Sequence, residues 1–287
     1  MEREGGQFRL QEVGVCLILA ILLAVVYWRI LQSLGAQWWD DPNYSHGFLV
    51  PLFSLYLVWQ QRASLRTLPR SGSLTGIPVI AAGIGALILG DLGAENFLMR
   101  SSLIVIIAGL ILFHLGIQVF RAVVFPVLFL FLMVPLPGIV FYAVTFPLQR
   151  LAAEQAAWTL EALGVPVLLD GNVIHLAQLT LGVTEACSGI RSLISLFAGA
   201  VVWAYMLLPG GWPMLAFVAA TVPITIFANA TRVVLTGLIG QHFGVEYASG
   251  FFHEFAGWAI YVFAFVALLA THSLLQAVSH RRWRRTP

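Results

Sequence analysis

Eight stretches of mainly hydrophobic residues constrain the fold of this chain more than any other feature. With approximate edges, they are 13–31, 46–60, 74–92, 101–118, 122–145, 189–208, 212–239 and 255–277. A helix of about 20 hydrophobic residues crosses the ~30 Å hydrocarbon core of a bilayer. Of the 287 residues, 10% are charged and 60% hydrophobic, whereas soluble domains have roughly 25% and 45–50%. The sequence therefore predicts an all-α polytopic membrane protein with about eight transmembrane helices.

The positive charges are distributed unevenly between the predicted loops. All 15 basic residues are arginines. With a cytoplasmic N-terminus, ten of them fall in inside segments and five in outside segments or at outer helix ends. Because cytoplasmic loops are enriched in Arg and Lys, this distribution favours both termini in the cytoplasm and an even number of crossings. The first run is too long for a typical signal-peptide core and lacks a small-residue cleavage pattern, so we expect it to be retained.

Prolines interrupt the fifth hydrophobic run. This run contains three prolines, which are Pro126, Pro135 and Pro137. Proline removes a backbone hydrogen bond and clashes with the preceding helical turn. These residues predict a kink or a break near Val134.

Residues 147–186 are too polar to span the membrane. Apolar residues recur at helical spacing over 148–163, which predicts an amphipathic helix at the outer membrane surface. Residues 165–176 then read as two short strands around the turn Asp170-Gly171-Asn172. We therefore expect an outer layer, a helix followed by a hairpin, that leads into the sixth span.

Three residues capable of covalent chemistry fall at the outer face in this topology. Cys187 precedes the sixth span and His253 precedes the eighth. Arg232 lies twenty residues after Trp212 at the inner start of the seventh span, a rise of roughly 30 Å. A thiolate attacks carbonyl carbons, an imidazole transfers protons, and an arginine stabilises an oxyanion. The combination is typical of acyl transfer by a cysteine nucleophile.

Each of these residues also has a simpler interpretation. Cys187, within Ala-Cys-Ser-Gly, would serve as a small packing residue, and Arg232 would extend from a helix end to the interface. His253 and Glu254 would form an ordinary interfacial pair. Arg191 lies one helical turn beyond Cys187 and is an alternative for the arginine role.

Other classes of function fit the sequence less well. His242, Glu246 and His253 have suitable ligand types for a metal but no compact motif, so we expect no metal and no cofactor. A transporter would carry polar residues near the bilayer midplane of two related halves, and neither feature is visible. An enzyme acting on a lipid-linked substrate stays open, because an outer-face arginine also suits a phosphate. Such chemistry should survive Cys187→Ser, whereas thiol acyl transfer should not.

Four motifs resemble the exosortase/archaeosortase family, the eight-span cysteine enzymes that sort proteins with a Pro-Glu-Pro C-terminal signal. The motifs begin at Tyr44 (Tyr-Ser-His-Gly-Phe-Leu-Val-Pro), Glu185 (Glu-Ala-Cys-Ser-Gly-Ile-Arg), Asn229 (Asn-Ala-Thr-Arg) and His253 (His-Glu-Phe-Ala-Gly-Trp). The second motif is specific, and the others occur in the expected order. The resemblance covers most of the chain, from about 39 to 275.

The resemblance implies an activity and a substrate. It implies that Cys187, Arg232 and His253 form the catalytic set of a cysteine peptidase or transpeptidase, and it favours Arg232 over Arg191. The substrates would be exported proteins ending in a Pro-Glu-Pro-like motif, a spanning helix and an arginine-rich tail. Cleavage would occur at the periplasmic face of the bacterial inner membrane, and the acyl group would pass to an acceptor.

The resemblance also sets the expected organisation of the chain. We expect a single exosortase-type transmembrane domain over 1–287, without the C-terminal soluble domain of some relatives. We expect contacts with membrane lipids and none with nucleic acid. Ser45 and His46 would either line the substrate entrance or cap the start of a helix. Participation of Glu185 in the site, the subclass and the exact signal stay open.

Overall fold

The computed structural model describes residues 14–15, 17–183, 189–208, 210–248 and 251–283, and most of them are helical. Within this described part, four segments are long and apolar enough to cross a membrane: Asn96–Met133, Ile190–Leu207, Trp212–Phe243 and Gly257–Val278. A fifth span results if the pair Leu17–Val26 and Trp28–Asp40, bent by 72°, crosses as one. The prediction of an all-α polytopic membrane protein is therefore confirmed.

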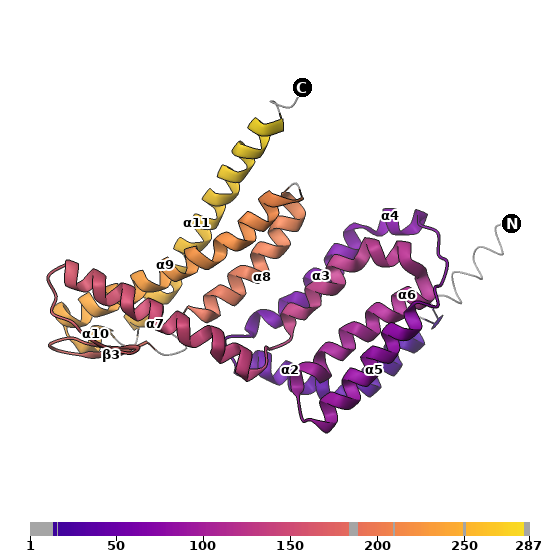
Figure 1. The fold of residues 1–287 in the computed structure, drawn as a ribbon, viewed down its shortest axis with the longest axis horizontal. Helices are drawn as coiled ribbons and strands as arrows, with labels where there is room; N and C mark the ends of the chain where they lie inside the picture. Colours follow the sequence, from indigo (N-terminus) through magenta and orange to yellow (C-terminus); the bar gives the residue numbers. More distant parts are fainter. Residues whose placement is uncertain (1–13, 16, 184–188, 209, 249–250, 284–287) are drawn as a thin grey trace. The chain divides into compact units, whose positions relative to one another are not determined.

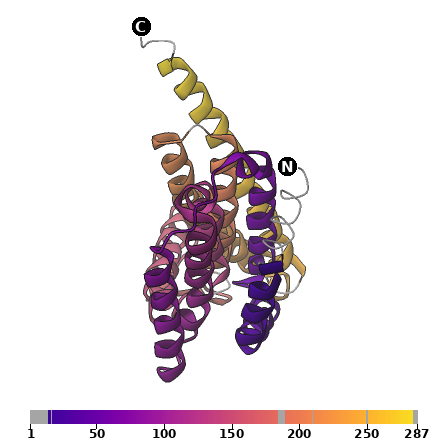
Figure 2. The ribbon, with the colours of Figure 1, turned by 90° about the vertical axis from the view of Figure 1, so that its right-hand side faces the viewer.

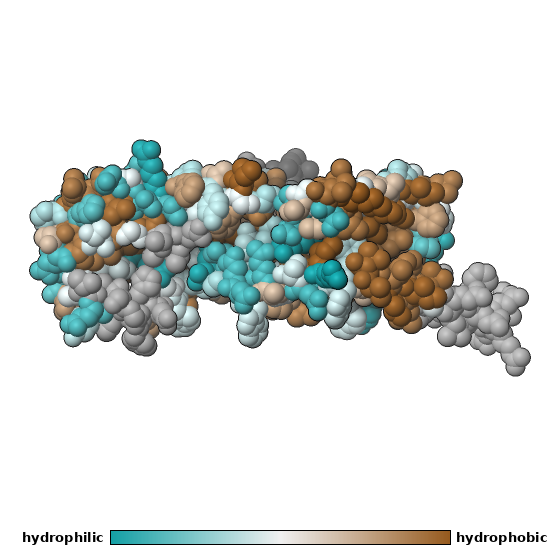
Figure 3. Space-filling view, turned by 90° about the horizontal axis from the view of Figure 1, so that it is seen from below, coloured by the Kyte–Doolittle hydropathy of each residue, from teal (hydrophilic) through white to brown (hydrophobic). Residues whose placement is uncertain are grey.

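The chain divides into two compact units, Met1–Pro137 (unit 1) and Gly138–Pro287 (unit 2). Both expose many large hydrophobic side chains, for example Leu52 and Leu55 in unit 1 and Leu215 and Phe227 in unit 2. Hydrophobic surface forms continuous patches on the face drawn in Figure 3. Exposed apolar surface of this extent suits contact with lipid rather than water. The expected single exosortase-type domain stays a prediction.

Unit 1 is a set of helices connected by short turns (Figure 1). After Leu17–Val26, its elements are α2 (Trp28–Asp40), η1 (Ser45–Phe48), α3 (Leu49–Gln60), α4 (Arg62–Thr67), α5 (Gly76–Leu92), α6 (Asn96–Phe129) and η2 (Leu130–Met133). Polar bonds connect α2 to α6. Arg100 is buried and donates to Gln37 Oε1 at 2.6 Å, and the Tyr27 hydroxyl lies 2.7 Å from Ser102 Oγ.

Glycines at seven-residue intervals bring α5 and α6 into close contact. A Cβ added to Gly76, Gly83 or Gly90 would approach atoms of α6 or its cap to between 2.5 and 2.8 Å. Small residues let helix backbones approach closely, which is the main packing device between helices in lipid. The two helices therefore pack as an antiparallel pair whose contact surface tolerates no side chain at these positions.

A break at Gly116 divides α6 into two helices, 96–115 and 117–129. Gly116 has φ 84° and ψ 175°, and a Cβ there would collide with the carbonyl oxygen of Ser71. Only glycine adopts this backbone conformation at no steric cost. The chain of α6 changes direction at this point (Figure 1). A straight helix over the 38 residues Asn96–Met133 would be roughly 57 Å long, about twice the bilayer core.

The predicted break near Val134 is confirmed. Helix η2 ends at Met133, Val134 is extended with φ −89° and ψ 118°, and α7 begins at Gly138. Pro126 lies inside α6, where the Ser54 hydroxyl donates to its carbonyl oxygen at 2.9 Å. The predicted fifth run therefore consists of parts of two helices in different units.

Unit 2 is arranged around one central helix. Its elements are α7 (Gly138–Ala162), β1 (Leu168–Asp170), β2 (Val173–His175), β3 (Thr180–Gly182), α8 (Ile190–Leu207), α9 (Trp212–Phe243), α10 (Val245–Ala248) and α11 (Phe251–Trp283). Helix α9 packs against α7, α8 and α11, and the long helices α8, α9 and α11 run side by side in both ribbon views (Figures 1 and 2). Buried Leu196, Ala228 and Ala264 join these three helices.

The predicted outer layer forms a helix and a small sheet. Residues 148–162 are the C-terminal part of α7, which begins ten residues earlier; the amphipathic character and the position at the membrane surface stay predictions. The hairpin is confirmed, with Leu168 opposite His175 and Asp170 opposite Val173. A third strand, β3, pairs antiparallel with β2 and was not predicted.

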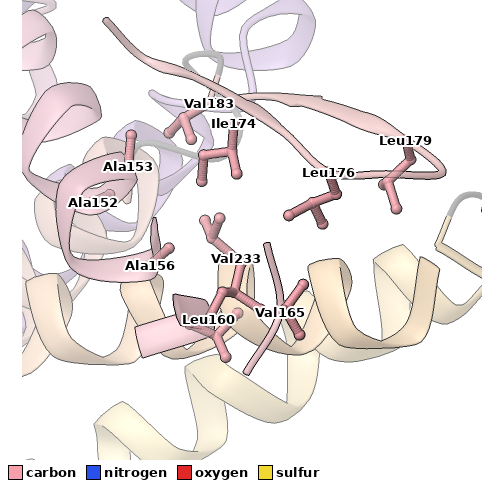
Figure 4. Close-up of a cluster of buried hydrophobic side chains, with 11 residues drawn as sticks. Ala152, Ala153, Ala156, Leu160, Val165, Ile174, Leu176, Leu179, Val183 and Val233 are labelled. Atoms are coloured by element: carbon pink, nitrogen blue, oxygen red, sulfur yellow. The ribbon is translucent and has the colours of Figure 1, made fainter. Parts of the chain in front are cut away.

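A hydrophobic core binds this layer to α9. It joins alanines of α7 and residues of the sheet segment to Val233 and Val234 of α9 (Figure 4). Ala153, Leu160 and Ile174 are fully buried there. The core therefore places the sheet beside the same stretch of α9 that carries Arg232.

Candidate active site

The predicted catalytic residues differ in how far the structure describes them. Cys187 and Glu185 lie outside the described residues. His253 lies in the first turn of α11. Arg232 lies on α9, where its side chain is partly buried, whereas Arg191 in the first turn of α8 is exposed. The catalytic roles of these residues stay predictions.

Helix α8 begins directly against α9. Gly189 is the N-cap of α8 and has φ 77°, in the left-handed region. A Cβ on Gly189 would lie 3.0 Å from Asn229 Cβ and 3.1 Å from Asn229 Cγ. Glycine is required here twice, for its backbone conformation and for the close approach to α9. The chain two residues after Cys187 is therefore held at Asn229.

Helix α11 contacts α9 one turn further along. A Cβ on Gly257 would lie 3.2 Å from Nη2 and 3.3 Å from Cζ of Arg232. The guanidinium group therefore lies against the backbone of α11 at Gly257. His253 precedes Gly257 by four residues, and positions i and i+4 share a helix face. The proximity of the His253 side chain to Arg232 stays a prediction.

One turn of α9 brings all three predicted segments together. Asn229 and Arg232 are three residues apart and so are neighbours on the helix surface. The first contacts the start of α8 and the second contacts α11. Because both contact points are glycines, the Asn229 and Arg232 side chains lie directly against the backbones of α8 and α11. A site made of Cys187, Arg232 and His253 stays a prediction.

Buried polar groups on α9 lead up to this turn. Thr221, Thr225 and Asn229 recur at four-residue intervals and are 1%, 3% and 5% exposed. The Thr236 hydroxyl donates to the carbonyl oxygen of Arg232 at 2.9 Å on the next turn. Sequence reasoning missed Asn229 as a site residue, although buried polar residues in a span are functional candidates by default. It also missed Gly189 and Gly257, whose importance depends on contacts between distant segments.

Residues of unit 1 named from the sequence have structural partners. Ser45 Oγ donates to the carbonyl oxygen of Pro42 at 3.3 Å, and no side-chain bond caps η1. His46 Nε2 lies 3.2 Å from the carbonyl oxygen of Leu132. The helix-cap interpretation of Ser45 is therefore wrong, and the entrance role of these residues stays a prediction.

Tyr44 makes a second contact between the segment before α3 and the segment around η2. Its hydroxyl oxygen accepts a bond from the backbone N–H of Leu136 at 3.2 Å. Burial raises the pKa of the Tyr44 phenol above its ordinary value, so the phenol is neutral near pH 7. The start of α3 is therefore joined to the break that follows η2.

No three His, Cys, Asp or Glu side chains gather as a possible metal site among the residues the structure describes. His242 Nδ1, one of the metal ligands considered above, lies 3.0 Å from the carbonyl oxygen of Leu238 in its own helix.

Three helices long enough to span a bilayer meet at a buried amide, Asn229, and a partly buried arginine, Arg232. These features define the class of membrane-embedded proteins with a polar site between spans. Residues 38–270 match the family model described as Transmembrane exosortase (Exosortase_EpsH). The match covers most of the chain, so the chain belongs to the transmembrane exosortase family. It includes the positions of Cys187, Arg232 and His253. Comparison with the curated proteins and with the solved structures gave no match.

Proposed function

We propose that this exosortase is a cysteine-dependent peptidase or transpeptidase that cleaves C-terminal sorting signals of exported proteins. The observation that carries the proposal is the meeting of three segments at one turn of α9. Gly189 contacts Asn229 there and Gly257 contacts Arg232. These contacts support the proposal because Gly189 follows Cys187 by two residues and Gly257 follows His253 by four, and covalent catalysis needs such groups close together.

The proposed chemistry assigns one role to each residue. The Cys187 thiolate attacks the carbonyl carbon of the scissile peptide bond, and Arg232 stabilises the oxyanion of the tetrahedral intermediate. His253 protonates the leaving amine as the C–N bond breaks, which leaves a thioester on Cys187. An amine, a lipid-linked acceptor or water then attacks the thioester and releases the thiol. The acyl group ends on the attacking nucleophile.

The proposed topology has eight crossings with both termini in the cytoplasm of a bacterium. The break at Gly116 supports counting 96–115 and 117–133 as separate spans. With the bent first pair, α3, α5, α8, α9 and α11, these make eight. The helix and sheet of 148–182 would then cover the periplasmic face, where a substrate with an inside arginine tail presents its Pro-Glu-Pro-like motif.

A processing assay tests this function. The enzyme would be co-expressed in a native-like membrane with a reporter that ends in a Pro-Glu-Pro motif, a spanning helix and an arginine tail. We expect the reporter to lose its C-terminal segment with the wild-type enzyme and with Cys16→Ala, but not with Cys187→Ala. The mass of the new C-terminus distinguishes hydrolysis from transfer.

A second substitution distinguishes the proposed peptidase from an enzyme that acts on a lipid-linked substrate. That alternative has support in the position of Arg232, since a guanidinium at a helix junction also binds phosphate. Cys187→Ser would abolish thiol acyl transfer and leave lipid-phosphate chemistry intact. Full reporter processing by Cys187→Ser would overturn the assigned nucleophile.

A further inference from the structure

Tyr261 is partly exposed on a face of α11 that is otherwise packed against neighbouring helices. The face includes Gly257, which contacts Arg232 of α9. At 3.6 residues per turn, Tyr261, Ala264 and Leu268 all lie within roughly 40° of that glycine around the helix axis. Ala264 and Leu268 are 1% and 5% exposed, whereas Tyr261 is 40% exposed. The packing of α11 is therefore looser at Tyr261 than further along the same face.

Helices α8 and α11 pack together beyond this point. Leu196 of α8 shares a buried cluster with Ala264, and Trp203 Nε1 donates to His272 Nδ1 at 3.2 Å. The two pairs are seven residues apart in α8 and eight residues apart in α11. The helices therefore run in the same direction with a nearly constant offset. By this offset, Tyr261 lies at the level of the first turn of α8.

Helix geometry directs the side chain of Tyr261 toward the contact between Gly257 and Arg232. In a helix, a long side chain points back toward the N-terminus and covers the turn before its own Cα. For Tyr261 this is the turn of Gly257, where the guanidinium group of Arg232 lies against the backbone. Within the part of the chain that the structure describes, the Tyr261 hydroxyl has no hydrogen-bond partner. Its O–H group is therefore available to a ligand beside Arg232.

A tyrosine near the end of a span often has a simpler role in the aromatic belt at the membrane interface. That role fits Trp258, which is 65% exposed and lies roughly 100° from Gly257 around the axis. A belt residue belongs on the lipid side of its helix, whereas Tyr261 lies on the packed face. Its position therefore favours a role within the protein.

We propose that Tyr261 is a further catalytic residue, a second oxyanion donor next to Arg232. This inference rests on the proposed function and deepens it. The phenolic O–H donates a hydrogen bond to the carbonyl oxygen of the scissile bond as negative charge develops there, and the proton stays on Tyr261. Neutral hydroxyl donors aimed at developing charge are an established form of oxyanion stabilisation.

Kinetics of a variant without the hydroxyl test this role. Purified full-length enzyme in lipid nanodiscs would cleave the Pro-Glu-Pro reporter, with kcat and KM measured separately. For Tyr261→Phe we expect kcat to fall by roughly 10²-fold and KM to stay within about twofold, because the hydrogen bond strengthens only in the transition state. Tyr142→Phe is the matched control, since Tyr142 of α7 is 44% exposed, and it should keep the wild-type kcat.

A photo-crosslink tests the contact with substrate independently of the reaction. In the Cys187→Ala enzyme, benzoylphenylalanine would replace Tyr261 or, as a control, Phe263. Phe263 is 48% exposed and points to a different side of the same turn of α11. We expect position 261 to crosslink to the reporter segment around the cleavage site, and position 263 to give roughly tenfold less of this product. Because no thiol is needed, the crosslink tests the contact even if the assigned nucleophile is wrong.

Several results would count against the proposal. An unchanged kcat in Tyr261→Phe would remove the hydroxyl from the reaction, and a rise in KM alone would assign it to substrate binding instead. Equal crosslinking at positions 261 and 263, or none at 261, would show that Tyr261 does not face the cleavage site. Processing that persists in Cys187→Ala while position 261 still crosslinks would contradict the proposed nucleophile and support the placement of Tyr261.

Discussion

Single residues determine how closely the segments of unit 2 approach the turn of α9 at Asn229 and Arg232. Gly189 and Gly257 each leave room for one α9 side chain. Asn229 lies against Gly189, and Arg232, the oxyanion-stabilising residue of the proposed mechanism, lies against Gly257. Matched single substitutions at these positions should therefore distinguish effects on reporter processing from effects on stability.

Arg232→Lys tests the arginine role. The substitution keeps the charge but removes the planar fork and the contact of the guanidinium with Gly257. We expect reporter processing to fall by roughly 10²–10³-fold, the loss seen when one oxyanion donor is removed. The rate of cleavage is the measurement, and Arg191→Lys is the matched control because Arg191 is exposed. Full activity in Arg232→Lys would remove Arg232 from its assigned role.

Gly257→Ala tests the position of the guanidinium. The added methyl group would lie 3.2 Å from Nη2 of Arg232, so the side chain must move by a few tenths of an ångström. Because small misplacements of catalytic groups slow reactions strongly, we expect processing to slow by roughly 10-fold or more with little change in thermal stability.

Gly199→Ala on α8 is the control for this substitution. A Cβ at Gly199 has no atom within 4 Å, so the variant should keep full activity. Equal rates for Gly257→Ala and wild type would show that the contact between Gly257 and Arg232 has no bearing on the reaction.

Gly189→Ala tests the approach of α8. Its left-handed backbone costs a non-glycine residue about 1–2 kcal/mol, and the new Cβ would also meet Asn229 at 3.0 Å. We therefore expect lower stability together with loss of processing. Gly164→Ala also has a positive φ, of 83°, but nothing within 4 Å. It should lose stability and keep activity, and a loss of activity in both variants would attribute the effect to instability alone.

At the scale of elements, the two faces of α5 differ in how much space surrounds their glycines. Gly83 is buried against Ile106 of α6, with 2.5 Å to Cγ1 for an added Cβ, whereas Gly85 has open space. We expect Gly83→Ala to lower the free energy of unfolding by roughly 1–3 kcal/mol through overpacking. Gly85→Ala should raise it by about 0.5–1 kcal/mol. Thermal unfolding in one detergent measures both, and similar shifts would contradict the packing of α5 on α6.

Elements with local signals could be predicted from the sequence. The break after Met133 follows from prolines, and the hairpin follows from the turn at Asp170-Gly171-Asn172. Strand β3 is three residues long and only its central Leu181 is partly buried, so it has no pattern to recognise. The break at Gly116 was hidden because glycine is common in membrane helices.

For the site, too, features that depend on local sequence could be predicted, whereas contacts between distant segments could not. Arg232 and His253 were placed at one depth by counting residues along spans, because helical rise is constant. The contact of Arg232 with Gly257 depends on how α9 packs against α11, which no local pattern encodes. Asn229 belongs to one of the four motifs, but its contact with Gly189 depends on how α8 packs against α9.

The whole molecule has a predicted orientation that can be tested by labelling. Asp170 in the sheet turn and Ser64 in α4 are both exposed. With both termini in the cytoplasm, a cysteine at Asp170 faces the periplasm and one at Ser64 faces the cytoplasm. In a Cys16→Ser, Cys187→Ser background, we expect a membrane-impermeant maleimide to label Asp170→Cys and not Ser64→Cys in intact cells. The opposite labelling would reverse the assigned topology.

The central position of α9 has an evolutionary consequence. The same two turns contribute Val233 and Val234 to the core beneath the sheet and Asn229 and Arg232 to the contacts at the proposed site. A substitution there would disturb folding and chemistry together, so this stretch can drift little in sequence. Exposed positions of the strands, such as Leu168 and Asp170, contribute to neither and should vary more freely.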